Sequence, residues 1–442
     1  MDIGSTLHIG FDDTDSPKGM CTTFLAFKIV DYLRKENSEF LDFPRLIRFN
    51  PNIPWKTRGN GAVSLKIKTK NPAKIKNKIK TLVSKYSDTK NGANPGLVFY
   101  ENKEIPSSFA EFSEMALWQL IHRHQAKKFA SENNLETFFI GNGQGLIGAI
   151  GAIGYQFIDH TLELLSYRKS NKFGKERKLS SQSVKNMQVK TFPNTFNSFD
   201  EKKNKVLIMP HGPDPVFYGV RGEQVDSLLR ATKILEPEEK LAGHMIFKSN
   251  QGTNDHLKNT FTKSTLKPYA SGIITGIVLC EPTMEKGGHV FFSIDCNGHE
   301  LPCAAYKKTG ITSIALGLIK GDKIHVGGGI RKASKTHPRI LNLEFIDIIK
   351  LEKKIVKSNP KCKICKKSMK SKGQNQGYRC VKCGKNSKNK TQYEIPRKIQ
   401  KQLYIPEVSA HRHLSRPITR LGKINKKKRF NDSSSWFSVY EK

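Results

Sequence analysis

The chain has 442 residues, 37% of them hydrophobic, and a formal net charge of +37 from 76 Lys and Arg against 39 Asp and Glu. This length exceeds the roughly 250 to 300 residues at which single cores stop growing, so it excludes a one-domain protein. The charge predicts a polyanionic partner, above all a nucleic acid, because each neutralised phosphate releases a counterion.

The beginning of the chain shows no basic leader with an apolar core, and the longest nearly apolar stretch, Leu146 to Phe157, is shorter than the ~20 residues of a bilayer span. The sequence therefore predicts a cytoplasmic protein without a membrane partner. Nothing in it implies a protein partner.

The first block of predicted elements extends over residues 1–158. Leu7 to Phe11 has the pattern of a buried strand, and Thr22 to Arg34 has apolar residues at helical spacing. Further elements are expected as strands at 45–50, 62–67 and 137–140 and helices at 72–86 and 113–132. The pattern indicates an α+β domain.

Three carboxylates, those of Asp12, Asp13 and Asp15, lie between the first strand and the first helix. Carboxylates bind divalent metals, and the start of a helix, where Thr22 stands, favours phosphate, so this turn predicts metal-assisted phosphoryl chemistry. A helix cap and a calcium loop are the alternatives. Capping needs one or two acids rather than three, and no acid follows at the closing position of an EF-hand loop.

Two glycine-containing segments follow in the same block. Lys56, Arg58, Gly59 and Gly61 form a turn that is suited to hold a polyphosphate, although a hairpin turn with solvated bases has the same composition. The segment 141–148 contains a variant of the dinucleotide-binding fingerprint. Its continuation as GAIGAIGY favours instead a close-packed helix or a second phosphate-approaching loop.

The second block, residues 159–265, predicts a ferredoxin-like domain. Strands are expected at 162–167, 206–209 and 244–248 and a helix at 223–232, around a loop-rich stretch at 170–204. Its polar loops predict contacts with a small substrate or RNA. The candidate residues are Asp214, Arg221, Glu223, Asn250 and Gln251.

The remainder predicts a strand-rich OB-fold at 266–353, a zinc ribbon at 358–390 and a basic extension at 391–442 whose end is disordered. Four cysteines form two CxxC pairs 14 residues apart, Cys362 with Cys365 and Cys380 with Cys383, which indicates a structural Zn²⁺ site rather than four free thiols. Residues 351–442 hold 26 Lys and Arg against 5 Asp and Glu. This part of the chain is therefore the expected RNA-binding arm.

Seven segments occur in an order that resembles the TiaS family, the archaeal 2-agmatinylcytidine synthetases of a minor isoleucine tRNA. They are IGFDDTDSPKGMCTT, FPRLIRFNPNIPWKTRGNGAVSLKI, NPGLVFY, GNGQGLIGAIGAIGY, HGPDPVFYGVRGE, FKSNQGTNDHL and, after the zinc ribbon, AHRHLSRP. The barrel segment AAYKKTGITSIALGLIKGD departs from the family pattern, because it lacks an acid and a Phe-Arg pair expected there.

The resemblance implies a kinase-like catalytic domain, a ferredoxin-like domain, an OB-fold and a zinc ribbon. It also implies a ligase that uses ATP and Mg²⁺ to attach agmatine to C2 of the wobble cytidine of the CAU-anticodon isoleucine tRNA, through a phosphorylated cytidine. Thr22 corresponds to the family's autophosphorylated threonine, and Asp214 or Glu223 is expected to receive the guanidinium of agmatine. The alternatives are a non-catalytic RNA-binding protein and a metal-dependent phosphohydrolase.

Overall fold

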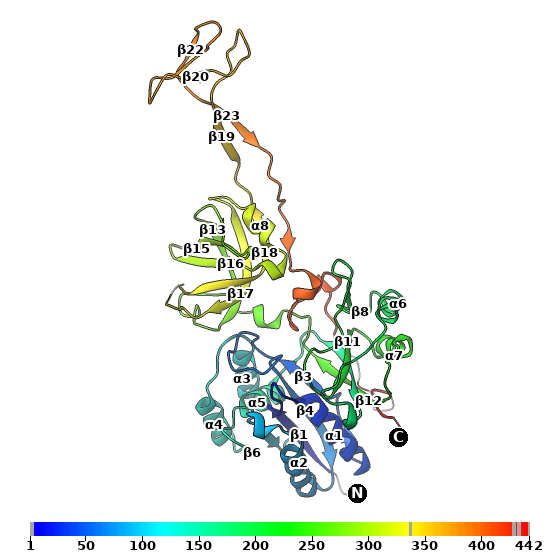
Figure 1. Ribbon diagram of the computed structural model, residues 1–442. Helices are drawn as coiled ribbons and strands as arrows, with labels where there is room; N and C mark the ends of the chain where they lie inside the picture. Colours follow the sequence, from blue (N-terminus) through cyan, green and yellow to red (C-terminus); the bar gives the residue numbers. More distant parts are fainter. Residues whose placement is uncertain (1–3, 336–337, 427–429, 431–434, 441–442) are drawn as a thin grey trace. The chain divides into compact units, whose positions relative to one another are not determined.

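The computed structural model of the chain describes residues 4–335, 338–426, 430 and 435–440 (Figure 1). These residues form two compact units. One contains the described residues of 1–273, 328–339 and 406–442, and the other contains residues 274–327 and 340–405.

A mixed sheet is the framework of the first unit, and eleven strands of its described residues belong to it. The order is β6-β5-β1-β4-β3-β12-β7-β11-β8, with β2 paired to β4 and β25 paired to β12. The strands are β1 (Ser5–Asp12), β2 (Glu39–Phe40), β3 (Arg45–Arg48), β4 (Gly61–Thr69), β5 (Gly96–Tyr100), β6 (Glu136–Phe139), β7 (Thr161–Arg168), β8 (Thr195–Phe196), β11 (Val216–Gly222), β12 (Leu241–Ser249) and β25 (Phe437–Val439). Strands β3 and β12 pair in parallel, so the two predicted N-terminal blocks share one sheet.

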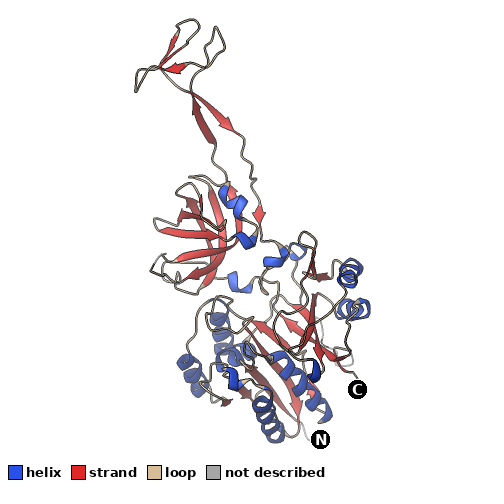
Figure 2. Cartoon of the chain, in the orientation of Figure 1, coloured by secondary structure: helices blue, strands red, loops and turns tan. Residues whose placement is uncertain are grey.

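Helices cover both faces of this sheet (Figure 2). One face carries α1 (Thr22–Lys35), α2 (Pro72–Tyr86), α6 (Ser181–Thr191) and α7 (Val225–Ile234), and the other carries α3 (Ser107–Trp118), α4 (Arg123–Glu132) and α5 (Leu146–Gly154). Helix α2 shows the reason: it buries Ile75, Ile79 and Val83, spaced by one turn, while its lysines are exposed or half-buried. Leu7, Ile9 and Phe11 of β1 pack into the same core, as the alternation of a strand requires.

Three sequence predictions in this unit are wrong in detail. The helix expected at 113–132 is two helices, because Gln119 is extended and His122 caps the start of α4, where its backbone N–H donates to Gln125 Oε1. Helix α6 lies inside the stretch expected to be loops, where Ser180 caps it. The strand expected at 206–209 is only β10 (Lys205–Val206), which pairs with β9 (Phe199–Asp200).

The second unit holds a closed barrel of five strands, which confirms the small barrel expected from the sequence. The barrel strands are β13 (Ser271–Val278), β15 (Val290–Asp295), β16 (Glu300–Ala305), β17 (Lys323–Arg331) and β18 (Ile340–Lys350). Closure comes from the pairing of β13 with β15. Smaller elements at the barrel are β14 (Thr283–Met284), α8 (Thr312–Leu316) and β24 (Leu403–Tyr404).

Two small sheets follow the barrel in the chain. Strands β19 (Lys354–Ser358) and β23 (Thr391–Ile395) form an antiparallel stem, and β20 (Lys370–Ser371), β21 (Tyr378–Arg379) and β22 (Asn386–Ser387) form a three-stranded sheet. The short 3₁₀ turns among the described residues of both units are Thr89–Asn91, Ser170–Lys172, Asp255–Leu257, Lys307–Thr309, Val408–Ala410 and Ile418–Arg420.

The C-terminal extension returns to the first unit, and the prediction that its end is disordered is wrong for residues 435–440. Strand β25 pairs with β12. The side chain of Trp436 is 0% exposed and packs among the aromatic side chains of the core. Within the predicted basic run Lys426 to Arg429, residues 427–429 lie outside the described residues. Among the helices that the structure describes, none combines the length and the apolar character that a membrane crossing needs.

Candidate functional site

The acidic turn lies where the sequence predicted it, between the end of a central strand and the start of a helix. Strand β1 is hydrogen-bonded on both sides, to β4 and β5, and ends at Asp12. Asp13 has φ 56°, in the left-handed region that Asp and Asn tolerate best among residues with a side chain. Helix α1 then begins at Thr22.

Burial raises the pKa of all three carboxyl groups of the turn, and repulsion from neighbouring carboxylates adds to the rise for Asp12 and Asp13. Burial, and then the charges of Asp13 and Asp15, raise the pKa of Asp12 well above its usual value. Burial and then Asp15 raise the pKa of Asp13 to about 6. Burial also raises the pKa of Asp15, although Arg58 opposes the rise. The four cysteines described below are the one group of three or more possible metal ligands that converge among the described residues, so the three carboxylates do not form a preassembled metal site. Desolvated carboxylates nevertheless suit a divalent cation, which would relieve the repulsion on Asp12 and Asp13.

The glycine-rich segment forms α5, and the close-packed helix expected as one reading of that segment is confirmed. A Cβ atom at Gly148 would lie 2.0 Å from Asp12 Oδ2, and one at Gly10 of β1 would lie 2.2 Å from the backbone oxygen of Ala149. The missing side chains therefore let α5 lie directly against β1 and leave room for the carboxylate of Asp12.

A pocket of about 700 Å³, part of it open to solvent, begins at the three carboxylates. Lys56, Gly59 and Gly61 line it, as the prediction of a polyphosphate-binding turn requires. Sequence reasoning assigned no role to Trp55, which lines the same pocket and is 48% exposed. Phe49, Ile53 and Ile121 add apolar side chains to the lining of this pocket.

Arg58 does not line this pocket but belongs to a larger one of about 1,990 Å³, which shares Asp15, Thr57, Gly59 and Gly61 with it. The guanidinium of Arg58 donates hydrogen bonds to Asp15 Oδ2 at 2.6 Å and to Asp214 Oδ2 at 3.4 Å. Thr22 also lines the larger pocket, and its hydroxyl accepts a hydrogen bond of 3.0 Å from Thr14. The acidic turn therefore separates two adjacent spaces.

The five residues predicted to bind a substrate do not all line the two pockets described above. Asp214 and Arg221 line the larger pocket. Glu223 instead accepts hydrogen bonds from the buried Arg420, at 2.5 Å, and from Asn425. The side chain of Asn250 bonds the backbone of Arg48, at 2.8 and 2.9 Å, and holds β12 to β3. Gln251 donates to Glu163 behind the pocket wall.

A buried polar cluster in that wall was missed by sequence reasoning. Glu163 has a side chain only 4% exposed, between Arg221 Nε at 3.3 Å and Arg48 Nη2 at 3.7 Å. His413, from the C-terminal segment, places Nδ1 3.0 Å from Arg221 Nη2. Burial, and then Arg48 and Arg221, lower the pKa of His413 well below its usual value, so the imidazole is neutral near pH 7.

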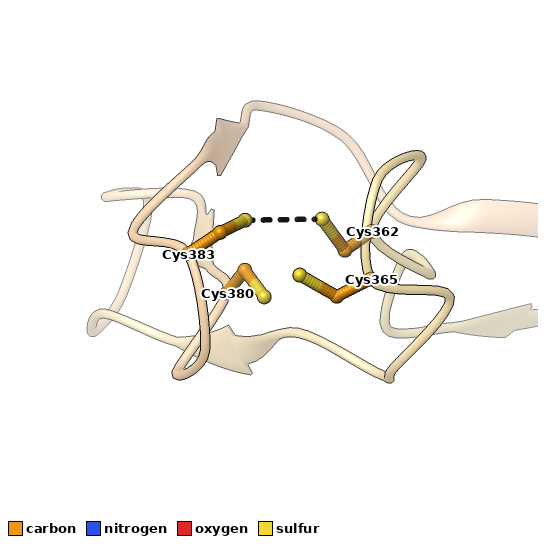
Figure 3. Close-up of side chains that lie close together, drawn as sticks. All are labelled: Cys362, Cys365, Cys380 and Cys383. Atoms are coloured by element: carbon orange, nitrogen blue, oxygen red, sulfur yellow. Dashed lines mark hydrogen bonds between the residues drawn. The ribbon is translucent and has the colours of Figure 1, made fainter.

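The four cysteines converge from two loops of the ribbon (Figure 3). Their sulfur atoms all lie within 4.8 Å of one another, close to the separation of about 3.8 Å that Zn–S bonds of about 2.3 Å require in a tetrahedron. The backbone N–H of Cys365, and then that of Ile364, lower the pKa of the Cys362 thiol to about 6. Four sulfur donors at this spacing fit a structural zinc ion.

Replacing Cys362 by serine should release this zinc and unfold the ribbon, because the short strands around it bury little apolar surface. We expect the zinc content of the purified protein to fall from about one ion per chain to a small fraction of that. Cys280→Ser, at an exposed cysteine outside the cluster, should leave the zinc content unchanged. A Cys362→Ser protein with its full zinc content would contradict the ligand assignment.

Comparisons with known proteins match three parts of the chain to family models, two that adjoin and a third nearer the C-terminus. Residues 8–142 match the TiaS TCKD domain, residues 143–256 the TiaS FLD domain, and residues 359–399 the TiaS C-terminal zinc ribbon domain. The boundary between the first two matched parts lies just before α5. Helix α5 therefore falls in the second part, although it packs against β1 of the first part.

Relatives and solved structures match over nearly the full length. The chain is 46% identical to TiaS, the isoleucine-tRNA 2-agmatinylcytidine synthetase, of Cenarchaeum symbiosum, over 99% of this chain and 98% of that protein. It is 41% identical to the TiaS of Thermococcus sibiricus, over 93% and 95%. Two crystal structures of TiaS with its isoleucine tRNA, one with ATP and one with AMPCPP and agmatine, superpose with TM-scores of 0.87 and 0.85, at 33% and 32% identity, over 96% of this chain and 100% of each TiaS chain. On this evidence the chain belongs to the TiaS family.

Proposed function

We propose that this protein is an ATP-dependent ligase that attaches agmatine to C2 of the wobble cytidine of the CAU-anticodon isoleucine tRNA. The product is 2-agmatinylcytidine, which reads AUA instead of AUG, and the site of action is the cytoplasm. The main support is the match, over the full length of the TiaS chain, to a structure with isoleucine tRNA, AMPCPP and agmatine. The carboxylate turn supplies a site for the phosphoryl chemistry.

Asp12, Asp13 and Asp15 would hold Mg²⁺, which their crowding and raised pKa values suit. When bound, the ion supplies positive charge beside the phosphoryl group that is transferred. Lys56 and the backbone N–H groups at Gly59 and Gly61 contact the polyphosphate of ATP in the same pocket. Arg58 fixes Asp15 and thereby the wall between the two pockets.

The chemistry requires activation, because the C2 oxygen of cytidine is a poor leaving group. Phosphorylation forms a bond between this oxygen and a phosphorus atom of ATP, breaks the bond from that phosphorus to its bridging oxygen, and releases the rest of the nucleotide as the leaving group. The amine of agmatine then attacks C2, the C2–O bond breaks, phosphate leaves, and the new C–N group loses a proton. Thr22, on the larger pocket, is the residue that we propose carries phosphate by autophosphorylation.

Asp214 is the carboxylate that we propose for the guanidinium of agmatine. Of the two acids expected from the sequence, Asp214 lines the larger pocket, whereas Glu223 is paired with Arg420. Arg221 and Gln251 act through Glu163, and Asn250 acts through the backbone of Arg48.

Four domains organise this activity in our proposal. Residues 1–158 form the kinase-like catalytic domain, and residues 159–265 form the ferredoxin-like domain. The barrel at 266–353 is an OB-fold that binds tRNA together with the ribbon at 358–390. The surplus of positive charge after residue 351 supports this division.

The test is incubation of the protein with ATP, Mg²⁺, agmatine and the CAU-anticodon isoleucine tRNA, followed by mass spectrometry of the nucleosides. We expect agmatinylated cytidine only in the complete mixture. Tight tRNA binding without product would favour a non-catalytic RNA-binding protein, and phosphate release that needs no tRNA would favour a phosphohydrolase.

The same incubation with γ-labelled ATP tests Thr22. We expect label on the protein that is absent from Thr22→Val, because the hydroxyl is the acceptor. Thr23→Val, at the next position of α1, is the matched control and should still be labelled. Equal labelling of Thr22→Val would move the acceptor to another residue.

A further inference from the structure

Arg48, the last residue of β3, has a buried guanidinium that its neighbours leave largely unbonded. Its side chain is 14% exposed, and its contact with Glu163 is an ion pair at 3.7 Å. Among the described residues its Nε has no hydrogen-bond partner. A guanidinium has five N–H donors, and leaving them unmet in a buried site costs stability. Arg58, by contrast, is bonded to Asp15, Asp214 and the carbonyl of Met20.

The position of Arg48 is built into the fold. The side chain of Asn250 holds both the backbone N–H and the carbonyl of Arg48, so the strand end is fixed independently of the guanidinium. Ideal Cβ atoms at Gly59 and Gly61 would lie 2.9 and 2.8 Å from Arg48 Nη1. The two glycines of the turn therefore make room for this guanidinium beside the segment that both pockets share.

The surroundings favour an anion. Arg48 lines the larger pocket with Arg58, Arg221 and Lys205, while the carboxylates there, Asp15, Glu163 and Asp214, are each already paired with an arginine. Helix α1 begins at Thr22 on the same pocket, with no acidic residue in its first turn and no side-chain cap. A phosphate group fits this site, because Arg48 has donors to give and the helix start adds a partial positive charge.

We infer that Arg48 binds the phosphoryl group handled at Thr22, as a bidentate partner of its oxygens. The ligand class is a phosphate mono- or dianion: the phosphate on Thr22 or the phosphoryl group in transfer. The role of Arg48 in the reaction rests on the proposed function. The binding of phosphate by Arg48 does not rest on it.

The experiment compares Arg48→Gln, Arg48→Lys and the double variant Arg48→Gln/Glu163→Gln. The double variant also removes the buried carboxylate that loses its contact with Arg48 in Arg48→Gln, although Arg221 still pairs with that carboxylate. Arg45→Gln is the matched control, since Arg45 lies on the same strand, pairs with Asp42 and lines neither pocket. The readouts are thermal unfolding, tRNA binding, labelling of Thr22 by γ-labelled ATP, kcat for agmatinylation, and calorimetric binding of inorganic phosphate.

We expect Arg48→Gln and the double variant to unfold near the parent temperature and to bind tRNA, yet to lose at least about 100-fold in kcat and in Thr22 labelling. Arg48→Lys should keep part of the phosphate affinity, because lysine supplies the charge without the fork. Recovery of activity in the double variant would show that Arg48 only neutralises Glu163, and would overturn the inference.

Failure of the proposed function is a separate result. If the parent makes no agmatinylated tRNA, the calorimetric binding of phosphate still tests the role of Arg48. Phosphate binding that Arg48→Gln abolishes supports the inference. Equal binding in the parent and the variant, or no binding in either, refutes it. If the parent makes the product and Arg48→Gln makes it equally fast, Arg48 has no part in the reaction.

Discussion

Asp13→Asn should abolish ligation and yet make the metal-free protein more stable. Asparagine keeps the left-handed backbone that Asp13 adopts, so the turn survives, but one carboxylate of the proposed Mg²⁺ site is lost. We expect agmatinylation to fall by at least about 1,000-fold. In a chelator at pH 7.5, the free energy of unfolding should rise by about 1 to 3 kcal/mol, because the variant no longer buries a charge beside Asp12 and Asp15.

The pH dependence follows from the raised pKa of Asp13. Between about pH 4 and pH 6 the folded parent keeps a proton that the unfolded chain has lost, so its stability falls as the pH rises through this window. Asp13→Asn lacks this group, and its advantage should therefore be small at pH 4 and complete above pH 6. Mg²⁺ should stabilise the parent at pH 7.5 and should have a much smaller effect on the variant.

The measurements are thermal unfolding in chelator and in Mg²⁺ at several pH values, beside the ligation assay. Asp31→Asn is a suitable control, since Asp31 is an acid of α1 that pairs with Lys35 and lines neither pocket. Ligation by Asp13→Asn at the parent rate would remove Asp13 from the catalytic turn. A variant less stable than the parent in chelator would show that the three carboxylates do not repel one another as proposed.

The acidic turn and the cysteine cluster were predictable because their signals are local. Asp12, Asp13 and Asp15 follow an apolar strand directly, and Cys362 and Cys365 with Cys380 and Cys383 form two short loops. In both cases neighbouring residues in the chain are neighbours in space. The backbone pattern alone therefore places them together.

The larger pocket was not predictable, because it joins residues that the sequence keeps far apart. Arg48, Glu163, Arg221 and His413 come from β3, β7, β11 and the C-terminal segment, and they meet only because β3 pairs with β12. A polar residue on a loop also does not reveal its partner. Glu223 resembles a substrate-binding acid in the sequence, but Arg420, almost two hundred residues later, binds it.

Composition gave the wrong result at the end of the chain for a related reason. The basic run before residue 430 outweighs the few apolar residues that follow, so the average predicts disorder. Trp436 and Phe437 nevertheless pack against α1 and β12. A short apolar segment gains order when a folded surface already offers it a strand edge and an aromatic contact.

Trp436→Ala should lower the free energy of unfolding by about 3 to 5 kcal/mol, which is the usual cost of removing a fully buried tryptophan. The indole of Trp436 packs edge-on to Phe40, with 5.3 Å between the ring centroids. The guanidinium of Arg34 lies 4.7 Å from the centroid of the indole. Removal of the indole leaves a cavity, and the guanidinium of Arg34 loses an aromatic partner. Calorimetric or denaturant unfolding of the first unit would measure the loss.

Trp55→Ala is the matched control, because Trp55 is half exposed and its removal should cost less than about 1 kcal/mol. His244 offers a second test of the same contact. It bonds the carbonyl of Ser435 at 3.1 Å and the hydroxyl of Tyr440 at 2.8 Å, so His244→Ala should weaken β25 without touching the tryptophan. If Trp436→Ala unfolds like the parent, residues 435–440 do not hold β12 in solution. The order of the C-terminal strand would then contribute nothing to the sheet that carries Arg48 and the acidic turn.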